Sequence, residues 1–504
     1  MNQVASRTPR WDLVVASFLA SAAFASVAFG AAFGAQGITA LGGFLLVAAV
    51  AVRRPTLPWS RVLLVLLLVI LFVPIRRYRI PGELPFQLEP YRVLVGLIVL
   101  GWVASLLVDP GVRLRRSGFE FAIGLILAAT IASIAVNPGR LAELQPTVLK
   151  ALTFFLSFVV VFYLVVSVVD TRRALDVLVK TLVAGGAVVA VLAVVEARAG
   201  FTPFTRLDQI LPFLTPDPSF GGAIGRGGAT RAYGPAEHPI ALGAALVMLV
   251  PLAIYVVRTA STRWWLAAAA LVVGVLSTVS RTGVVMLLVV GLVFFWLRRR
   301  EVKRLWPALL PVLVITHFAV PGTLGSLKQA FLPQDGLVAE QRGSAGSCSS
   351  SGRVADLSPT LAEVGEKPFL GYGFGTRITT GPDSNACILD NQWLGTLLDV
   401  GAFGALAWLL LFLTVLRRLG KAAKDDDSPL GWLLVAVTAG IAAYAVGMFT
   451  FDALGFIQVT FLLFVLLGLG AAAAKLRVDA PSQLGASRAG AQPPRSVRLG
   501  SSST

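Results

Sequence analysis

The stretch FFLSFVVVFYLVVSVV, residues 154–169, contains no charged side chain over its whole length. With the residues before it, the stretch reaches the roughly 20 residues that an α-helix needs to cross about 30 Å of hydrocarbon. The segments VLLVLLLVILFVPI (62–75) and GALAWLLLFLTVL (404–416) have the same character. Because these apolar runs do not alternate with polar residues, they lack the pattern of an outer-membrane barrel. The sequence therefore predicts membrane-spanning α-helices.

Composition supports this prediction across the whole chain. Of its 504 residues, 56% are hydrophobic and 14% are charged, whereas soluble proteins carry roughly 25% charged residues. The formal net charge is +17, but the basic residues fall mostly in short loops between apolar runs. Basic residues in such loops are topology signals, so we expect a lipid bilayer around the protein and no nucleic acid partner.

The apolar segments predict an all-α fold, a polytopic transmembrane helical bundle of about 14 spans, with 12–14 as the range. The expected spans are 13–35, 38–52, 61–75, 92–108, 119–136, 150–169, 174–195, 239–257, 264–280, 282–297, 305–320, 392–416, 430–450 and 453–474. Lys and Arg are more frequent in the loops on the N-terminal side of the membrane, which predicts that both termini lie inside. An exception is IRRYRIPGELPFQLEPYR (75–92), which places four arginines outside; either the topology differs there, or these arginines meet an anionic group.

Two outer segments, 196–238 and 321–391, are longer than simple connections require, which is typical of functional loops. The second is the one large extracytoplasmic loop of the predicted topology, and its stretch SPTLAEVGEKPF (358–369) predicts an amphipathic helix. We divide the chain into N-terminal transmembrane helices (1–195), a region that carries the function (196–474) and a low-complexity cytoplasmic tail expected to be disordered (475–504).

The two cysteines, Cys348 and Cys387, both fall in the large outer loop. In an oxidising exterior they can form a disulfide, although two unpaired thiols are equally compatible with the sequence. The two histidines, His238 and His317, lie far apart, and there is no Cys-x-x-Cys motif. The sequence therefore predicts no metal site and no cofactor.

Polar residues at membrane depth are costly and are therefore informative. The stretch RGGATRAYGPAEHPIALG (226–243) contains Arg231, and Glu237 and His238 stand where a span begins. These residues are compatible with an interfacial anchor and a helix cap, or with a functional site.

In STVSRTGVV (277–285), Arg281 stands between two apolar runs. A snorkelling arginine at a tight hairpin is one reading; we favour a phosphate-binding arginine, because the charge stands beside small and hydroxyl-bearing residues. The stretch SGRVADLSPTLAEVGEKPFLGYGFGT (351–376) adds Arg353 and a glycine-rich turn whose backbone allows a close approach.

The stretch LDNQWLGTLLDVGAFG (389–404) opens with Asp390 and Asn391, a position where an acid or amide often only caps a helix. The glycines that follow, Gly401 and Gly404 among them, would normally mark helix–helix packing. Asn391 followed by Gly401-x-x-Gly404 resembles a motif of the O-antigen ligase and O-antigen polymerase superfamily. The blocks around Arg231, Ser280-Arg281 and 351–376 follow in the order of that family, and the resemblance covers about 196–470.

The resemblance implies a metal-independent glycosyltransferase of the cytoplasmic membrane. Such enzymes move a glycan from a polyprenyl-diphosphate carrier to an acceptor hydroxyl on a glycan or glycolipid, on the outer face, and they act alongside other polysaccharide-assembly proteins. It assigns Arg231, Arg281 and Arg353 to the donor diphosphate, and Asn391, Gly401 and Gly404 to the acceptor motif. The family has a His before the Asn; this chain has Asp390 at that position, which makes Asp390 the candidate base that activates the acceptor hydroxyl. Since a free Asp is a weak base at pH 7, Glu237 and His238 remain alternative bases.

Two other classes of function remain open. One is a transporter such as a lipid-linked oligosaccharide flippase, but the sequence shows no internal repeat and its charges gather at one face. The other is a non-catalytic subunit of a polysaccharide export system, in which Asp390 has replaced a catalytic His. The motifs do not separate a polymerase from a ligase.

Overall fold

In the computed structural model, the described part of the chain comprises residues 59–79, 89–217, 224–226, 229–305, 307, 309–320, 322–332, 356–379, 383–424 and 426–489. It is mostly helical, and seven of its helices are long and apolar enough to cross a membrane. They are Pro90–Val108 (α4), Pro138–Val168 (α6), Arg172–Ala199 (α7), Pro239–Thr259 (α9), Gln392–Lys424 (α17), Pro429–Gly447 (α18) and Ile457–Ala489 (α19). The prediction of a polytopic helical protein is confirmed, whereas the span number of 14 and the orientation stay predictions.

Shorter apolar helices complete the bundle: Trp59–Phe72 (α3), Glu120–Ala135 (α5), Trp265–Ser277 (α10), Arg281–Leu297 (α11) and Leu309–Ala319 (α13). The remaining helices are small and connect them: Leu207–Ile210 (α8), Arg299–Leu305 (α12), Thr323–Phe331 (α14) and Leu357–Glu366 (α16), with 3-10 turns at Pro203–Thr205 (η1) and Thr262–Trp264 (η2). The amphipathic helix predicted near 358–369 is α16. The spans predicted at 13–35 and 38–52 lie outside the described residues.

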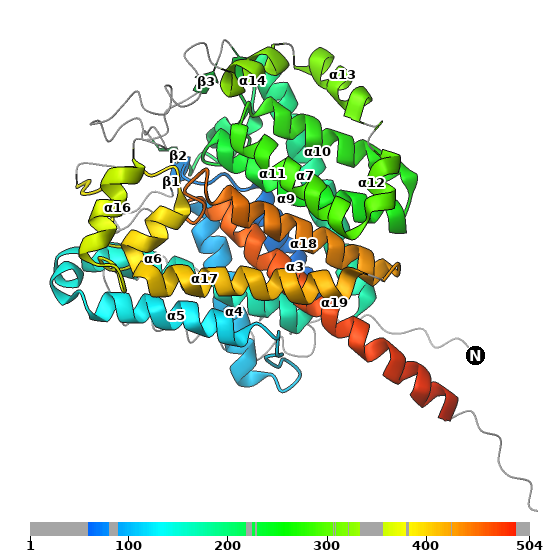
Figure 1. Ribbon diagram of the computed structural model, residues 1–504, viewed down its shortest axis with the longest axis horizontal. Coiled ribbons are helices and arrows are strands. Elements are labelled where there is room, and N and C mark those ends of the chain that lie inside the picture. Colours follow the sequence, from blue (N-terminus) through cyan, green and yellow to red (C-terminus); the bar gives the residue numbers. More distant parts are fainter. Residues whose placement is uncertain are drawn as a thin grey trace, which may run out of the picture.

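Short strands lie at one end of the bundle. Tyr78–Arg79 (β1) pairs with Thr215–Pro216 (β2), and Ile224–Arg226 (β3) pairs with Ala229–Arg231 (β4), both antiparallel. Figure 1 shows α16 and the β1–β2 pair at the same end of the bundle, on the left, while α19 runs out at the lower right. Helix α19 continues to Ala489, into the segment expected to be a disordered tail.

Three helices form the centre of the bundle. In the most apolar 18-residue stretch of each helix, 89% of the residues are buried in α9 and in α18 and 94% in α19. The corresponding share in α4 is 33%. Close approach is possible because small residues face each other: a Cβ added at Gly274 of α10 would lie 2.6 Å from the Cβ of Ala190 in α7. Outer helices carry exposed apolar side chains such as Phe121 and Leu266, which suits contact with lipid chains.

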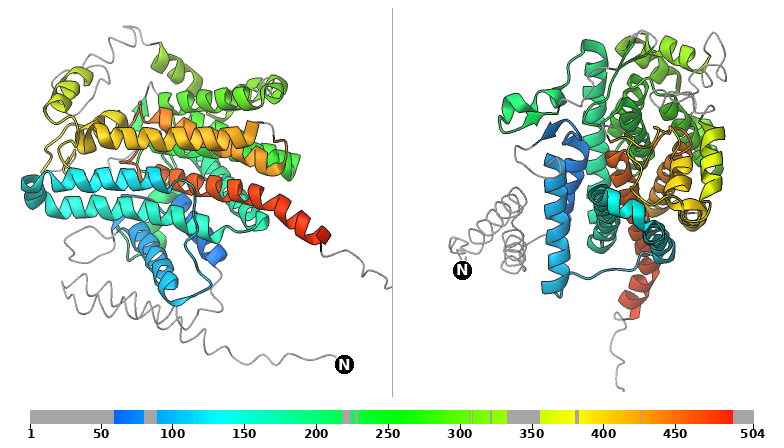
Figure 2. Two further views of the ribbon diagram at one scale, coloured as in Figure 1. Left: turned by 60° about the horizontal axis from the view of Figure 1, so that its bottom comes forward. Right: turned by 90° about the vertical axis from the view of Figure 1, so that its left-hand side faces the viewer.

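Local signals in the sequence determine where the helices begin. Thr171 and Ser428 cap α7 and α18 by accepting hydrogen bonds from backbone N–H groups three residues later, and α4, α6, α9 and α18 begin with proline. Two long helices are bent internally. Helix α6 is bent at Leu144, next to Pro146, and α17 is bent at Gly401. In Figure 2, α5, α6 and α17 run side by side.

Candidate active site

The predicted phosphate-binding Arg281 is the first residue of α11. Ser280 precedes it as the helix cap, and its Oγ accepts a hydrogen bond from the N–H of Gly283 at 3.4 Å. Val279 has φ of 47°, a left-handed conformation that costs a β-branched residue on the order of 1–3 kcal/mol. A guanidinium therefore stands beside the positive end of a helix, at a turn held in an unfavourable conformation, and this combination suits an anion.

Arg231 ends strand β4 and is buried, with 6% of its surface exposed. Its Nε donates to the carbonyl of Thr278 at 2.9 Å, and the N–H of Ala232 donates to the carbonyl of Ser277. The structure thus brings the Arg231 block directly against the turn that carries Arg281. The side chain of Arg231 holds this turn by binding a backbone carbonyl of the turn, and it adds a buried positive charge there.

Glu237 lies just before α9 and is engaged on both oxygens. Oε1 accepts from the N–H of Ile457 at 3.1 Å, and Oε2 lies 2.9 Å from Nη1 of Arg76. Burial raises the pKa of the Glu237 carboxyl, while the nearby charge of Arg76 acts in the opposite direction. Because both of its oxygens have partners, Glu237 is suited to joining α9, α19 and the segment that follows α3 more than to accepting a proton from a substrate.

His238 caps α9 with its ring: Nδ1 accepts the N–H of Ile240 at 3.2 Å. The ring stacks on Phe456, with centroids 6.0 Å apart. Burial, followed by the charge of Arg231, lowers the pKa of His238 to about 4. A neutral imidazole that accepts at Nδ1 carries its proton on Nε2, so His238 is arranged to donate a hydrogen bond, and general-base catalysis would break its cap.

The loop 448–456 between α18 and α19 joins these parts. The N–H of Gln392 donates to the carbonyl of Met448 at 2.7 Å, and the N–H of Leu454 donates to Oε1 of Gln392 at 2.7 Å. Thr282 of α11 reaches the same loop through the carbonyl of Thr450, at 3.4 Å. The starts of α11, α17 and α19 therefore share one set of contacts.

Asp452 of this loop is a site residue that the sequence reading missed. The pKa of Asp452 is raised, and burial is the largest cause. The charges of Arg377 and Arg76 oppose this increase, whereas the carboxylate of Asp390 adds to it. All four side chains are thus close enough to interact. An acid in a very short connection between two apolar spans is a signal that could have drawn attention to Asp452. The signal for Arg76 was noted in the arginine-rich stretch 75–92.

Asp390 and Asn391 precede α17. Oδ1 of Asn391 accepts the N–H groups of Trp393 and Leu394 at 3.0 and 3.3 Å, so Asn391 supplies the cap that the sequence also allowed Asp390 to supply. Asp390 is partly exposed and acts electrostatically on Asp452. The carboxylate therefore lies at the shared end of the bundle, close enough to Asp452 to act on it electrostatically.

Gly401 has a different role from the helix–helix contact that the sequence suggested. Its φ is 66° and its ψ is −168°, which bends α17, and an added Cβ would overlap the backbone of Phe369 and Leu370. The broken helix ladder is completed by the glycine-rich turn, since the N–H of Tyr372 donates to the carbonyl of Leu398 at 2.7 Å. At Gly404, an added Cβ would meet the side chain of Val400 in the same helix.

Arg377 follows the glycine-rich turn and was also missed. Its Nη1 lies 3.9 Å from Oδ1 of Asp399, and its Nη2 donates to the carbonyl of Cys387 at 3.0 Å. Cys387 is disulfide-bonded. Its predicted partner Cys348, like the predicted donor-binding residue Arg353, lies outside the described residues, so both of these assignments stay predictions.

Within the described residues, no group of three or more His, Cys, Asp or Glu side chains is placed to hold a metal ion. The charged groups at this end are arginines facing carboxylates. They offer guanidinium donors to an anion and oxygen acceptors to a hydroxyl.

The bundle and its charged end define a multi-pass membrane protein. Residues 265–409 match the family model described as O-Antigen ligase. This match confirms the resemblance of this segment to the O-antigen ligase and polymerase superfamily. The matched segment includes Arg281, Asp390, Asn391, Gly401 and Gly404. No curated protein matches the chain. At the level of the family, the matched segment indicates a membrane glycosyltransferase of O-antigen ligase or polymerase type.

Proposed function

We propose that the protein transfers a glycan from a polyprenyl-diphosphate carrier to an acceptor sugar hydroxyl, at the end of the bundle that carries Arg281 and Asp390. The observation that supports this most is the common position of these two residues. Both belong to the family segment, and both lie at helix starts that contact the loop 448–456. A cation for the leaving group and a carboxylate for the acceptor therefore stand at helix starts that contact the same loop.

The donor diphosphate binds at the start of α11 in this proposal. Arg281 makes the direct contact, Arg231 adds buried positive charge behind it, and Arg353 is the third proposed arginine. When the bond between the anomeric carbon and the phosphate oxygen breaks, the departing diphosphate gains negative charge. Guanidinium groups placed there beforehand stabilise this charge in the transition state, so the arginines supply what a metal ion provides in other transferases.

Asp390 accepts the proton of the acceptor hydroxyl as its oxygen attacks the anomeric carbon. The carboxylate of Asp390 faces the buried Asp452, whose pKa is raised mainly by burial and in smaller part by the charge of Asp390. Gln392 and Asn391 fix the start of α17 and thereby the position of Asp390. His238 donates a hydrogen bond to donor or acceptor oxygens, and Glu237 positions Arg76.

We place this end of the bundle on the extracytoplasmic face of the cytoplasmic membrane. The distribution of Lys and Arg along the sequence supports this orientation. Under it, the arginine-rich stretch 75–92 lies outside, and its Arg76 belongs to the site because it pairs with Glu237.

Purified protein supplied with a polyprenyl-diphosphate oligosaccharide and an acceptor tests the proposal. Longer glycans on the carrier identify a polymerase, and transfer to a different lipid identifies a ligase. Movement of the intact lipid across the bilayer without a new glycosidic bond identifies a flippase and contradicts the proposal.

Arg281→Ala tests the site within the same assay. Loss of one donor to a developing anion lowers turnover by about 10²–10³-fold, and Arg281→Lys recovers only part of it because a lysine lacks the bidentate fork. Arg263→Ala is the matched control, since Arg263 is exposed in η2 at the opposite end of the bundle. A folded Arg281→Ala protein with the turnover of the control would rule out the diphosphate site.

A further inference from the structure

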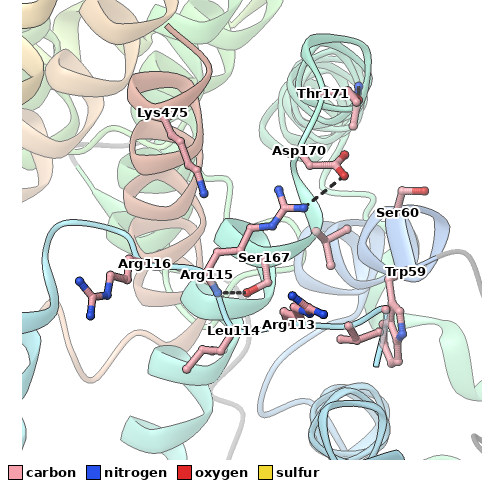
Figure 3. A pocket seen from close by; sticks show the side chains of 14 residues that line it. Trp59, Ser60, Arg113, Leu114, Arg115, Arg116, Ser167, Asp170, Thr171 and Lys475 are labelled. Atoms are coloured by element: carbon pink, nitrogen blue, oxygen red, sulfur yellow. Dashed lines mark hydrogen bonds and ion pairs between the residues drawn. The ribbon is translucent and has the colours of Figure 1, made fainter. Parts of the chain in front are cut away.

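A second charged site lies at the other end of the bundle. An open pocket of about 700 Å³ is lined by the start of α3, the loop 111–116, the connection between α6 and α7, and Lys475 of α19. Figure 3 shows Arg115 between the start of α7 and Lys475, with Trp59 and Ser60 on the far side of the pocket. The pocket draws on four separate parts of the chain and shares no residue with the candidate active site.

The lining of this pocket is strongly basic. Its charged residues are Arg113, Arg115, Arg116 and Lys475, against the single acid Asp170. Arg115 Nη2 lies 3.4 Å from Asp170 Oδ2, with side chains 35% and 50% exposed, and such an exposed pair is weak. An excess of positive charge therefore remains around the pocket.

Backbone features of the pocket also favour an anion. The N–H of Arg115 donates to Oγ of Ser167 at 3.2 Å, which fixes the basic loop against the end of α6. Thr171, another lining residue, caps α7, so the positive end of this 28-residue helix lies at the pocket. A phosphate group would find guanidinium groups, hydroxyls and a helix start in one place.

The basic pocket continues into an apolar one. A neighbouring pocket of about 240 Å³ shares Ser60, Thr171 and Ala174 with it and runs on between α3 and α7, where Leu64, Val177 and Leu178 line it. Val177 is 42% exposed. A charged space that opens into an apolar groove matches a lipid, with its phosphate in the first part and an acyl chain in the second.

We propose that this combined pocket binds an anionic glycerophospholipid, with the headgroup phosphate on Arg113 and Arg115 and an acyl chain along α3 and α7. Basic residues in loops can serve as topology signals without forming a pocket. That role does not explain why four separate segments line this one pocket. Basic pockets between transmembrane helices are where anionic headgroups bind. The proposal is independent of the transferase activity.

Native mass spectrometry of the purified full-length protein tests it, with phosphatidylglycerol and phosphatidylcholine as the two probes. We expect the wild type to retain phosphatidylglycerol in preference. Arg113→Gln and Arg115→Gln each lower that retention by about fivefold, since one positive charge is lost. Arg263→Gln, an exposed arginine at the same end but outside the pocket, leaves it unchanged. Equal unfolding temperatures show that the variants fold.

A second pair of measurements separates a lipid from a free phosphate. Val177→Trp fills the apolar groove and is expected to lower retention of phosphatidylglycerol severalfold, while glycerol phosphate competes only weakly with the lipid. If glycerol phosphate competes as well as the lipid, the pocket is a site for a free anion and the proposal is wrong. The proposal also fails if the arginine variants retain phosphatidylglycerol as the wild type does.

Discussion

The two ends of the bundle use charge differently. At the active-site end, Glu237 and Arg231 are almost fully buried and engaged with backbone groups from other elements. At the opposite end, Arg115 and Asp170 are exposed around an open pocket, while the buried Arg298 donates to the carbonyls that end α17. Burying charges of both signs and bending the backbone both cost free energy. These costs occur together at the active-site end, which indicates that the chemistry takes place there.

The bend in α17 is where this comparison predicts the largest effect. In Gly401→Ala, the added Cβ overlaps the backbone of Phe369, and the left-handed φ disfavours any side chain. We expect a loss of several kcal/mol in the free energy of unfolding, measured as a fall in folded yield and unfolding temperature in detergent.

Gly395→Ala is the control in the same helix. An added Cβ there meets its nearest neighbour, the side chain of Gln392, at an ordinary 3.5 Å, so it should be tolerated. Similar unfolding temperatures for the two variants would show that α17 does not depend on its bend.

We expect the carboxylates of Asp390 and Glu237 to differ in their effect on turnover. Asp390→Asn removes the proposed base and should lower turnover by about 10²–10⁴-fold without lowering the unfolding temperature. Glu237→Gln should keep most of the turnover, because the amide oxygen still accepts the N–H of Ile457. The reverse result, with Asp390→Asn active and Glu237→Gln inactive, would reassign the base.

His238 predicts a specific dependence of stability on pH. Its pKa is lowered to about 4 from 6.5, so the unfolded chain binds the proton more tightly than the folded protein does. The contribution to stability is complete above pH 6.5 and is lost as the pH falls towards 4, up to about 3 kcal/mol. His238→Asn keeps a cap but cannot titrate, so its unfolding temperature should fall less over this range. Parallel curves for the two proteins would show that His238 does not carry this dependence.

Matched removal of one carboxylate at each end gives the smallest effects. Glu237→Gln removes the charge from a side chain that is 6% exposed and should cost about 1–3 kcal/mol. Asp170→Asn breaks an exposed pair and should change stability by less than about 1 kcal/mol. Both values come from thermal or denaturant unfolding in one detergent, and equal values would mean that the two ends do not differ as described.

Much of the fold could be predicted because apolar runs of about 20 residues leave few alternatives to helices. The blocks around Arg231 and Arg281 were also predicted, and the structure brings them together through Thr278. Helix capping at Asn391 was visible from residue type.

The remaining features depend on contacts between distant segments. Gly401 resembled a packing glycine, and only its contact with Phe369 shows that it bends α17. Asp452 and Arg377 belong to no recognisable motif. Only the structure shows that the two side chains are close enough to interact. His238 resembled a candidate base, but the direction of its ring, which caps α9, could not be inferred from the sequence.

The central claim is that Arg281 and its neighbours hold a diphosphate at one end of the bundle. Binding of a fluorescent polyprenyl diphosphate to the wild type, Arg281→Ala and Arg263→Ala in nanodiscs tests this claim most directly. We predict that Arg281→Ala binds at least about tenfold more weakly, whereas Arg263→Ala binds as the wild type does. Equal affinity for all three proteins would contradict the account.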